Sequence, residues 1–131
     1  MPVFTDAELA YLRGERRLAR LATVGPDGTP HVTPVGMWSV DADSGVVEAT
    51  GQDFAATKKF RDVARTRRAA IVIDDVLPPF QPRNVEVRGA AEALSGPQPR
   101  IRIHPERIVS WGLDGPWRRT ARSIPSPARQ R

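Results

Sequence analysis

Residues 22–38 read ATVGPDGTPHVTPVGMW, a pattern typical of a β-hairpin. The turn sequence at residues 26–28 (PDG) combines a preset φ, a side-chain acceptor and a glycine that tolerates positive φ. Strand-forming residues flank this turn on both sides. The second arm contains Pro34 and Gly36, and both residues weaken a regular strand. We therefore expect this arm to serve a purpose besides pairing in the sheet.

The rest of the chain predicts a mainly β (α+β) fold with about six short antiparallel strands and two short helices. Short strands joined mostly by turns favour a barrel over a parallel sheet with crossover helices. Pro105 is expected to interrupt the last strand. The strands are expected at residues 18–24, 31–38, 46–50, 69–74, 83–94 and 100–113.

The two helices have recognisable start signals. Residues 5–8 (TDAE) form a capping box that starts a helix at Asp6, and Gly14 is expected to end it. The second helical stretch covers residues 54–68, for which Asp53 is the predicted N-cap.

Length and composition predict one domain at residues 1–116 of the 131-residue chain. The absence of cysteine excludes disulfides, thiolate metal sites and a cysteine nucleophile. The sequence has no apolar run long enough for a membrane span and no signal-peptide pattern, so a cytoplasmic protein without membrane contact is expected.

The net charge of +5 resides in the C-terminal segment. Residues 118–131 contain five arginines and no acid, and the remaining 15 basic and 15 acidic residues cancel. The segment 117–131 is rich in Ser, Pro and Arg, and we expect it to be a disordered tail. No nucleic-acid partner is expected, although a contact made by this tail is the alternative.

Catalysis by protein side chains finds little support in the sequence. His31 and His104 are the only histidines and lie far apart, so no metal site is predicted. The serines lack a nucleophile motif, and no acids are paired for proton transfer. The catalytic residues are therefore unknown.

The start of the second helix has an unusual charge pattern. Thr57, Lys58 and Lys59 lie where the helix macrodipole is positive. Lys58 and Lys59 are the only lysines of the chain. A hydroxyl, two ammonium groups and free backbone N–H groups suit a phosphate. The alternative is a solvated charged face of the helix.

Met37, Trp38 and Trp111 are candidates to flank a planar ring system. As ordinary core residues they would need no such role.

Four segments together resemble the pyridoxamine 5′-phosphate oxidase-like flavin and deazaflavin proteins, which have a split β-barrel of the FMN-binding type. The chain looks closest to their F-420-dependent branch, over most of residues 4–115. The segments occur in the family's order and spacing: RLATVGPDGTPHVTPVG (20–36), TGQDFAATKKFRDV (50–63), RNVEVRGAAEAL (83–94) and IRIHPERIVSWGLD (101–114).

The resemblance implies a homodimer with a cofactor at each end of the subunit interface. It assigns Lys58, Lys59 and the Thr57 hydroxyl to the cofactor phosphate, with Thr50 beneath it. The backbone of Val35, Gly36, Met37 and Trp38 would run along the cofactor ring. Asn84 occupies a position where some relatives have a glutamine that reaches the cofactor, and Trp111 falls near the partner's site.

The implied function is an oxidoreductase that uses coenzyme F-420 for hydride transfer, with an unknown substrate. The alternatives are an FMN-binding flavoprotein of the same fold and a non-catalytic cofactor-binding or carrier protein. The connection at residues 95–99 (SGPQP) is shorter than in relatives, and the substrate motif of the true pyridoxamine phosphate oxidases is missing. Vitamin B6 oxidation is therefore not expected.

Overall fold

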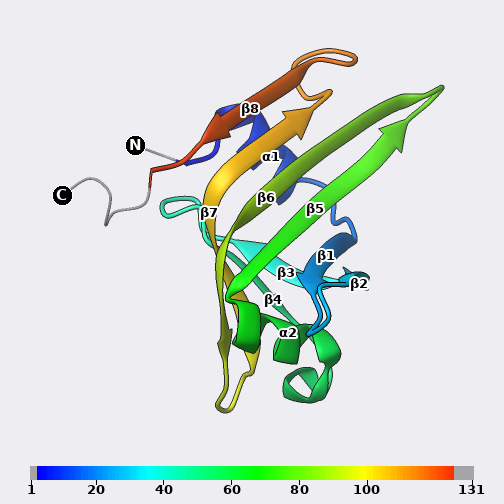
Figure 1. Ribbon diagram of the computed structural model, residues 1–131. Coiled ribbons are helices and arrows are strands. Elements are labelled where there is room, and N and C mark those ends of the chain that lie inside the picture. The colour runs from blue at the N-terminus through cyan, green and yellow to red at the C-terminus, as the bar shows by residue number, and fades with distance from the viewer. Residues whose placement is uncertain (1–2, 126–131) are drawn as a thin grey trace.

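The computed structural model describes residues 3–125, which form a curled antiparallel sheet with two α-helices (Figure 1). The prediction of a mainly β split barrel is confirmed, with eight strands instead of about six. The strands are β1 (Ala19–Val24), β2 (Pro30–Val35), β3 (Met37–Val40), β4 (Val47–Thr50), β5 (Arg68–Leu77), β6 (Gln81–Leu94), β7 (Arg100–Trp111) and β8 (Arg119–Ser123). The helices are α1 (Asp6–Arg13), the 3₁₀ turn η1 (Phe54–Ala56) and α2 (Lys58–Thr66).

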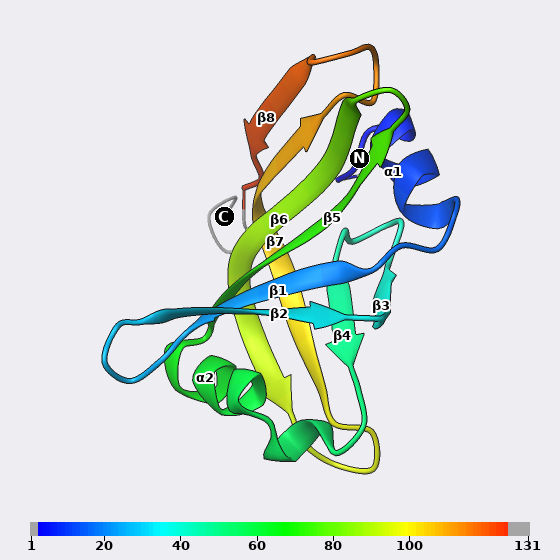
Figure 2. The ribbon, with the colours of Figure 1, turned by 90° about the vertical axis from the view of Figure 1, so that its right-hand side faces the viewer.

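The sheet order explains how the barrel forms. The strands follow the order β2-β1-β5-β6-β7-β4-β3, and β8 pairs with β7 outside this path. Strands β2 and β3 are thus at opposite ends of the order, yet only Gly36 separates them in the chain. The sheet must curl to bring its two ends together, and Figure 2 shows the end of β2 close to the start of β3. Apolar side chains from the inner face form the core.

The β1–β2 hairpin forms as predicted. Its turn is closed by a hydrogen bond from the Gly25 N–H to the Thr29 carbonyl at 2.9 Å, and Gly28 has a φ of 84°. Strand β2 pairs only with β1 in the sheet. Proline is tolerated on such an edge because its missing N–H breaks no ladder there, which accounts for Pro30 and Pro34.

The capping box of α1 is also confirmed. The Glu8 N–H donates to the Thr5 hydroxyl at 3.1 Å, and the Thr5 N–H donates to the Glu8 carboxylate at 3.0 Å. Gly14 follows the last helical residue as the C-cap.

The predicted start of the second helix was wrong. Asp53 adopts a left-handed conformation with a φ of 49° and makes no capping hydrogen bond. The chain first makes the η1 turn, which buries Phe54, and α2 begins afterwards with Thr57 as its N-cap. The Thr57 hydroxyl accepts a hydrogen bond from the Phe60 N–H at 3.3 Å. The burial of the Phe54 ring thus outweighs the capping preference of Asp53.

Pro105 interrupts the regular β6–β7 pairing, as predicted, but the strand continues through it. Strand β7 runs through it, and the β6–β7 register shifts between Arg88 and Gly89. Gly89 lies opposite Pro105, and a Cβ atom at this glycine would approach the His104 carbonyl oxygen to 1.9 Å. A β-bulge and a side-chain-free residue therefore accommodate the proline.

The expectation of a disordered tail at 117–131 fails for residues 119–123, which form β8. This strand pairs with β7 from Arg107↔Ser123 to Trp111↔Arg119. Arg122 contributes a buried ion pair with Glu8, with nitrogen–oxygen distances of 2.6 and 3.0 Å. Local sequence shows neither the strand partner nor the ion pair. Residues 126–131 lie outside the described residues.

Candidate functional site

Two adjoining hollows run along β3 and β4 to the start of α2. The larger has a volume of about 510 Å³ and the smaller about 220 Å³, and they share Gly36, Met37 and Thr50. Lys59 lines the end of the smaller hollow, and Arg16 and Arg100 line the larger one. We call the two hollows together the groove. Five of the ten predicted cofactor-binding residues line its smaller part: Val35, Gly36, Met37, Thr50 and Lys59.

The strand predicted to follow a cofactor ring presents backbone and one exposed side chain to the groove. Met37 is 60% exposed, whereas the Val35 and Trp38 side chains are buried in the core. The indole N–H of Trp38 donates to the Arg17 carbonyl at 2.7 Å, so its ring does not project outward. A Cβ atom at Gly36 would meet only the end of the Leu18 side chain, at 3.8 Å. The face of Gly36 that lacks a side chain is therefore open to a flat ligand.

The two lysines occupy the first two positions of α2, closer to the helix end than the sequence predicted. The first turn contains no acidic residue, and within residues 3–125 neither lysine has a carboxylate within salt-bridge distance. The Lys59 ammonium lies 5.4 Å from the centre of the Phe54 ring. These two cations and the helix dipole together favour an anion at this end of the groove.

Asp62 holds α2 against the β1–β2 hairpin. Its carboxylate is buried, accepts a hydrogen bond from the Thr23 hydroxyl at 2.9 Å, and lies 3.0 Å from His31 Nδ1. Burial alone would raise the pKa of Asp62, but the hydrogen bonds from His31 and Thr23 outweigh it and hold the pKa below its usual value. The resulting fixed carboxylate sets the position of the helix start that carries the lysines.

The two predicted threonines are engaged inside the protein. The Thr57 hydroxyl donates to the Phe54 carbonyl at 2.7 Å while it caps α2. The Thr50 hydroxyl donates to the Pro99 carbonyl at 2.6 Å. Their hydroxyl hydrogens are therefore already committed, which leaves oxygen lone pairs but no free donor.

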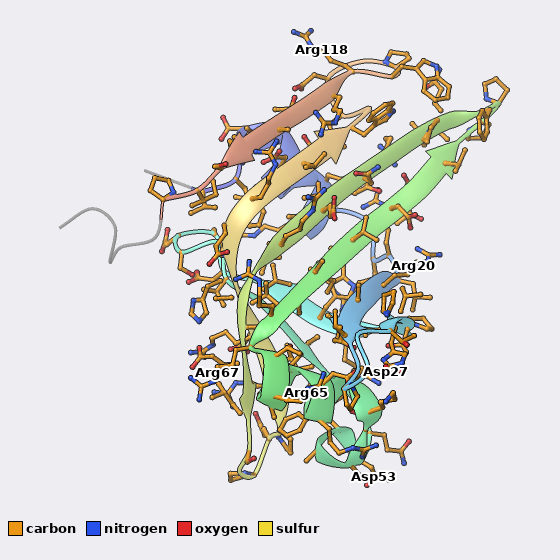
Figure 3. The ribbon with its side chains drawn as sticks, viewed as in Figure 1. Arg20, Asp27, Asp53, Arg65, Arg67 and Arg118 are labelled. Atoms are coloured by element: carbon orange, nitrogen blue, oxygen red, sulfur yellow. The ribbon has the colours of Figure 1, made fainter. Side chains whose placement is uncertain are left out.

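Asn84 and Trp111 lie far from the lysines within one chain. They are paired with each other across β6 and β7. Asn84 also lies opposite Asp74, six residues along β5 from Arg68 near the end of α2, a separation of about 20 Å. Figure 3 shows the two ends of the molecule through its labels, with Arg118 at one end and Asp53 near α2 at the other.

Arg16 is a groove residue that the sequence did not indicate. Its Nη2 atom donates to the carbonyls of Gly36 and Trp38 at 2.6 and 2.7 Å. The segment before β1 gives no local signal for this contact, because the partner strand lies about twenty residues further along the chain. Arg100 and Gln98 of the larger hollow were also missed.

Other kinds of site find no support in the part of the chain that the structure covers. Residues 3–125 contain no group of three histidine or acidic side chains arranged to hold a metal ion. None of the helices described is long and apolar enough to cross a membrane.

Comparison with protein families identifies the family of the chain. A family model described as pyridoxamine 5′-phosphate oxidase matches residues 5–126. The chain belongs to this family. One relative is the 5a,11a-dehydrotetracycline/5a,11a-dehydrooxytetracycline reductase of Streptomyces rimosus, which is 44% identical over 123 residues. The aligned region covers 86% of this chain and 85% of the reductase.

Solved structures confirm the fold of the family. A heme-binding protein from Mycobacterium smegmatis superposes with a TM-score of 0.68 at 17% identity; the match covers 92% of this chain but only 58% of that protein. A structure described as an F420 reductase has a TM-score of 0.55 at 24% identity, and covers 73% of this chain and 91% of its own. At these identities the likeness concerns the fold alone.

Proposed function

We propose that this protein is a homodimeric oxidoreductase that binds coenzyme F-420 in the groove and reduces a planar, conjugated substrate. The observation that carries the proposal is the continuity of the groove: a cationic helix start lies at one end, and the side-chain-free face of Gly36 and the exposed Met37 side chain lie beside it. The reductase relative at 44% identity supports the same class of activity, and the fold is shared with a structure described as an F420 reductase.

The donor set fits a phosphate-bearing planar cofactor. Lys58 and Lys59 would hold the phosphate, and the Gly36–Met37 backbone would face the ring. Thr57 would act indirectly, because its hydroxyl caps α2 and so fixes the two lysines. Thr50 would support the loop that leads to η1 through its bond to Pro99. When bound, the cofactor supplies the hydride-transfer chemistry, and the protein binds, orients and shields it.

Asn84 and Trp111 would reach the groove only from a second subunit. The far end of β6 and β7 carries both residues, and exposed aromatic side chains such as Phe80 and Trp117 lie nearby. Analytical ultracentrifugation is expected to show a dimer, as the family resemblance implies. A monomer that still binds the cofactor would remove Asn84 and Trp111 from the site.

Cofactor titration tests the proposal directly. The purified protein is expected to quench the fluorescence of F-420 on binding, and to reduce members of a panel of enones, nitroaromatics and tetrapyrroles when reduced F-420 is supplied. Tight FMN binding without F-420 binding would assign the groove to a flavin. Binding without turnover across the whole panel would indicate a carrier, which is the alternative from a different class.

Replacement of Gly36 tests the position of the ring. Gly36→Ala is expected to change the free energy of unfolding by less than about 1 kcal/mol, because the new methyl group meets only the flexible end of Leu18. Gly36→Val adds bulk over the groove and should weaken cofactor binding about tenfold, or ~1.4 kcal/mol. Chemical denaturation and fluorescence titration measure the two quantities. Equal affinity of Gly36→Val and wild type would place the ring elsewhere.

A further inference from the structure

Arg16 is an exposed arginine that several contacts nevertheless hold in one position. Its guanidinium carbon lies 4.4 Å from the centre of the Trp38 ring, a cation–π contact. One nitrogen, Nη2, donates to the carbonyls of Gly36, which precedes β3, and of Trp38 within β3. Trp38 is in turn fixed by its bond to the Arg17 carbonyl. The Arg16 side chain therefore loses little further conformational entropy when it binds a ligand.

The contacts leave N–H donors on Nε and Nη1 of the guanidinium available. Within residues 3–125, only Nη2 of Arg16 has hydrogen-bond acceptors, and Nε and Nη1 donate to none of these residues. Arg16 also lines the larger hollow of about 510 Å³. The backbone carbonyls that hold Nη2 carry no net charge, so the positive charge of Arg16 is not neutralised.

Arg100 and Glu48 also line the larger hollow. Glu48 is the acidic residue that lines it, and its Oε2 atom accepts from Arg100 at 3.3 Å and from Arg102 at 2.7 and 2.9 Å. Two arginines thus share one carboxylate. Arg102 contacts Glu48 without lining this hollow, and with Arg16 the set of four side chains carries a net charge of +2. Met37 and Ala49 add apolar surface to the lining.

A hollow with apolar surface and an uncompensated, pre-positioned cation suits a particular kind of ligand. The apolar surface can pack against the face of a planar ring, and a free N–H group of Arg16 can donate to an anionic oxygen at the rim of that ring. A neutral ring would gain the first contact but not the second.

We propose that Arg16 makes the larger hollow selective for planar rings that carry a delocalised negative charge. This inference rests on the proposed function, in which the ring is that of F-420 or FMN. Arg16 then favours the more negative form of the ring over the neutral form, in addition to its support of β3.

Two ring chemistries test the proposal. The ring of reduced FMN carries one more negative charge than the oxidised ring at mildly alkaline pH. Arg16→Met is therefore expected to lower the affinity for reduced FMN about tenfold more than the affinity for oxidised FMN. This ratio corresponds to a midpoint potential about 30 mV more negative for the bound flavin. For F-420, whose ring hydroxyl ionises near neutral pH, the variant is expected to raise the pKa of the bound ring, read from its absorbance.

The matched variants separate charge from structure. Arg16→Lys keeps the charge and should retain part of the selectivity. Arg13→Met removes an exposed arginine that does not line the larger hollow and should behave as wild type. Equal loss of affinity for both FMN forms, or an unchanged ring pKa for F-420, would overturn the role of Arg16 and reduce it to a structural support. If the wild type bound neither cofactor, the proposed function would fail as well, whereas binding without selectivity leaves that function intact.

Discussion

The Lys58→Ala/Lys59→Ala double variant is expected to lose affinity for the phosphate-bearing cofactor by a factor of roughly 10²–10⁴. Each charge-assisted hydrogen bond to a phosphate contributes about 1.5–3 kcal/mol, and both lysines lie at the positive end of α2. Fluorescence titration with F-420 and with FMN measures the change. Lys59→Ala should account for the larger part, because Lys59 lines the smaller hollow and Lys58 does not.

The fold of the double variant should be intact. Lys58 is exposed, Lys59 is half-buried, and neither forms a salt bridge within the described part of the chain. Arg61→Ala is the matched control, because it removes a positive charge from the same helix outside both hollows. The affinity of wild type should also fall with added salt, and less so in the double variant. An unchanged dissociation constant in the double variant would return the lysines to the solvated face of a helix.

Local signals were sufficient for the start of the first helix and for the turn of the first hairpin. The capping box at Thr5–Glu8 and the turn at residues 26–28 form as predicted, because each depends on contacts within a few residues. The irregular arm with Pro34 and Gly36 was also informative. It divides into an edge strand, β2, and a strand that lines the groove, β3.

The prediction that both lysines lie in the first two turns of the second helix is confirmed, but the predicted N-cap was wrong. Asp53 is a better N-cap than most residues, but burial of Phe54 requires the η1 turn between Asp53 and α2. The helix consequently starts at Lys58, which brings both lysines closer to the positive end of the dipole. Only the start of the helix was predicted wrongly. Its observed start places both lysines where an anion is favoured more strongly.

Contacts between distant segments could not be predicted from the sequence alone. Arg16 binds carbonyls about twenty residues away, and its segment reads only as a basic stretch before β1. Arg122 binds Glu8 across 114 residues, and its segment reads as a polar tail. In both cases one side chain binds groups that only the folded sheet brings near. No periodicity or spacing in the sequence therefore predicts the contact.

The Arg122→Met variant is expected to lose about 3–5 kcal/mol of unfolding free energy near neutral pH, a large part of the stability of a small domain. Glu8 is only 1% exposed, and Arg122 donates to both of its carboxylate oxygens and to the Val3 carbonyl. Removal of the guanidinium leaves a buried carboxylate whose remaining partners are the Thr5 N–H and Ser110. Urea denaturation with a fluorescence readout measures the difference.

The pH dependence of this loss gives the sharper test. In wild type, burial would raise the pKa of Glu8, but the bonds from Arg122 and Thr5 outweigh it and hold the pKa below the usual 4.5. The pair therefore stabilises the fold above that pH, and its contribution is lost as the pH falls through the lowered pKa. In Arg122→Met burial dominates and the pKa of Glu8 rises. Acidification then protonates this carboxyl and removes the cost of burying its charge. The difference between the two proteins should accordingly be largest at neutral pH and shrink on acidification.

Two further variants distinguish the ion pair from the packing of β8. Arg119→Met changes an exposed arginine of the same strand and should stay within about 0.5 kcal/mol of wild type. The double variant Glu8→Gln/Arg122→Met removes the uncompensated charge and should recover part of the loss, because a neutral amide is less costly to bury than a carboxylate. If Arg122→Met were as stable as Arg119→Met, β8 would add nothing to the fold beyond its backbone pairing. The opposite outcome makes an arginine of the basic C-terminal segment a structural partner of the first helix, because the buried Glu8 requires its charge.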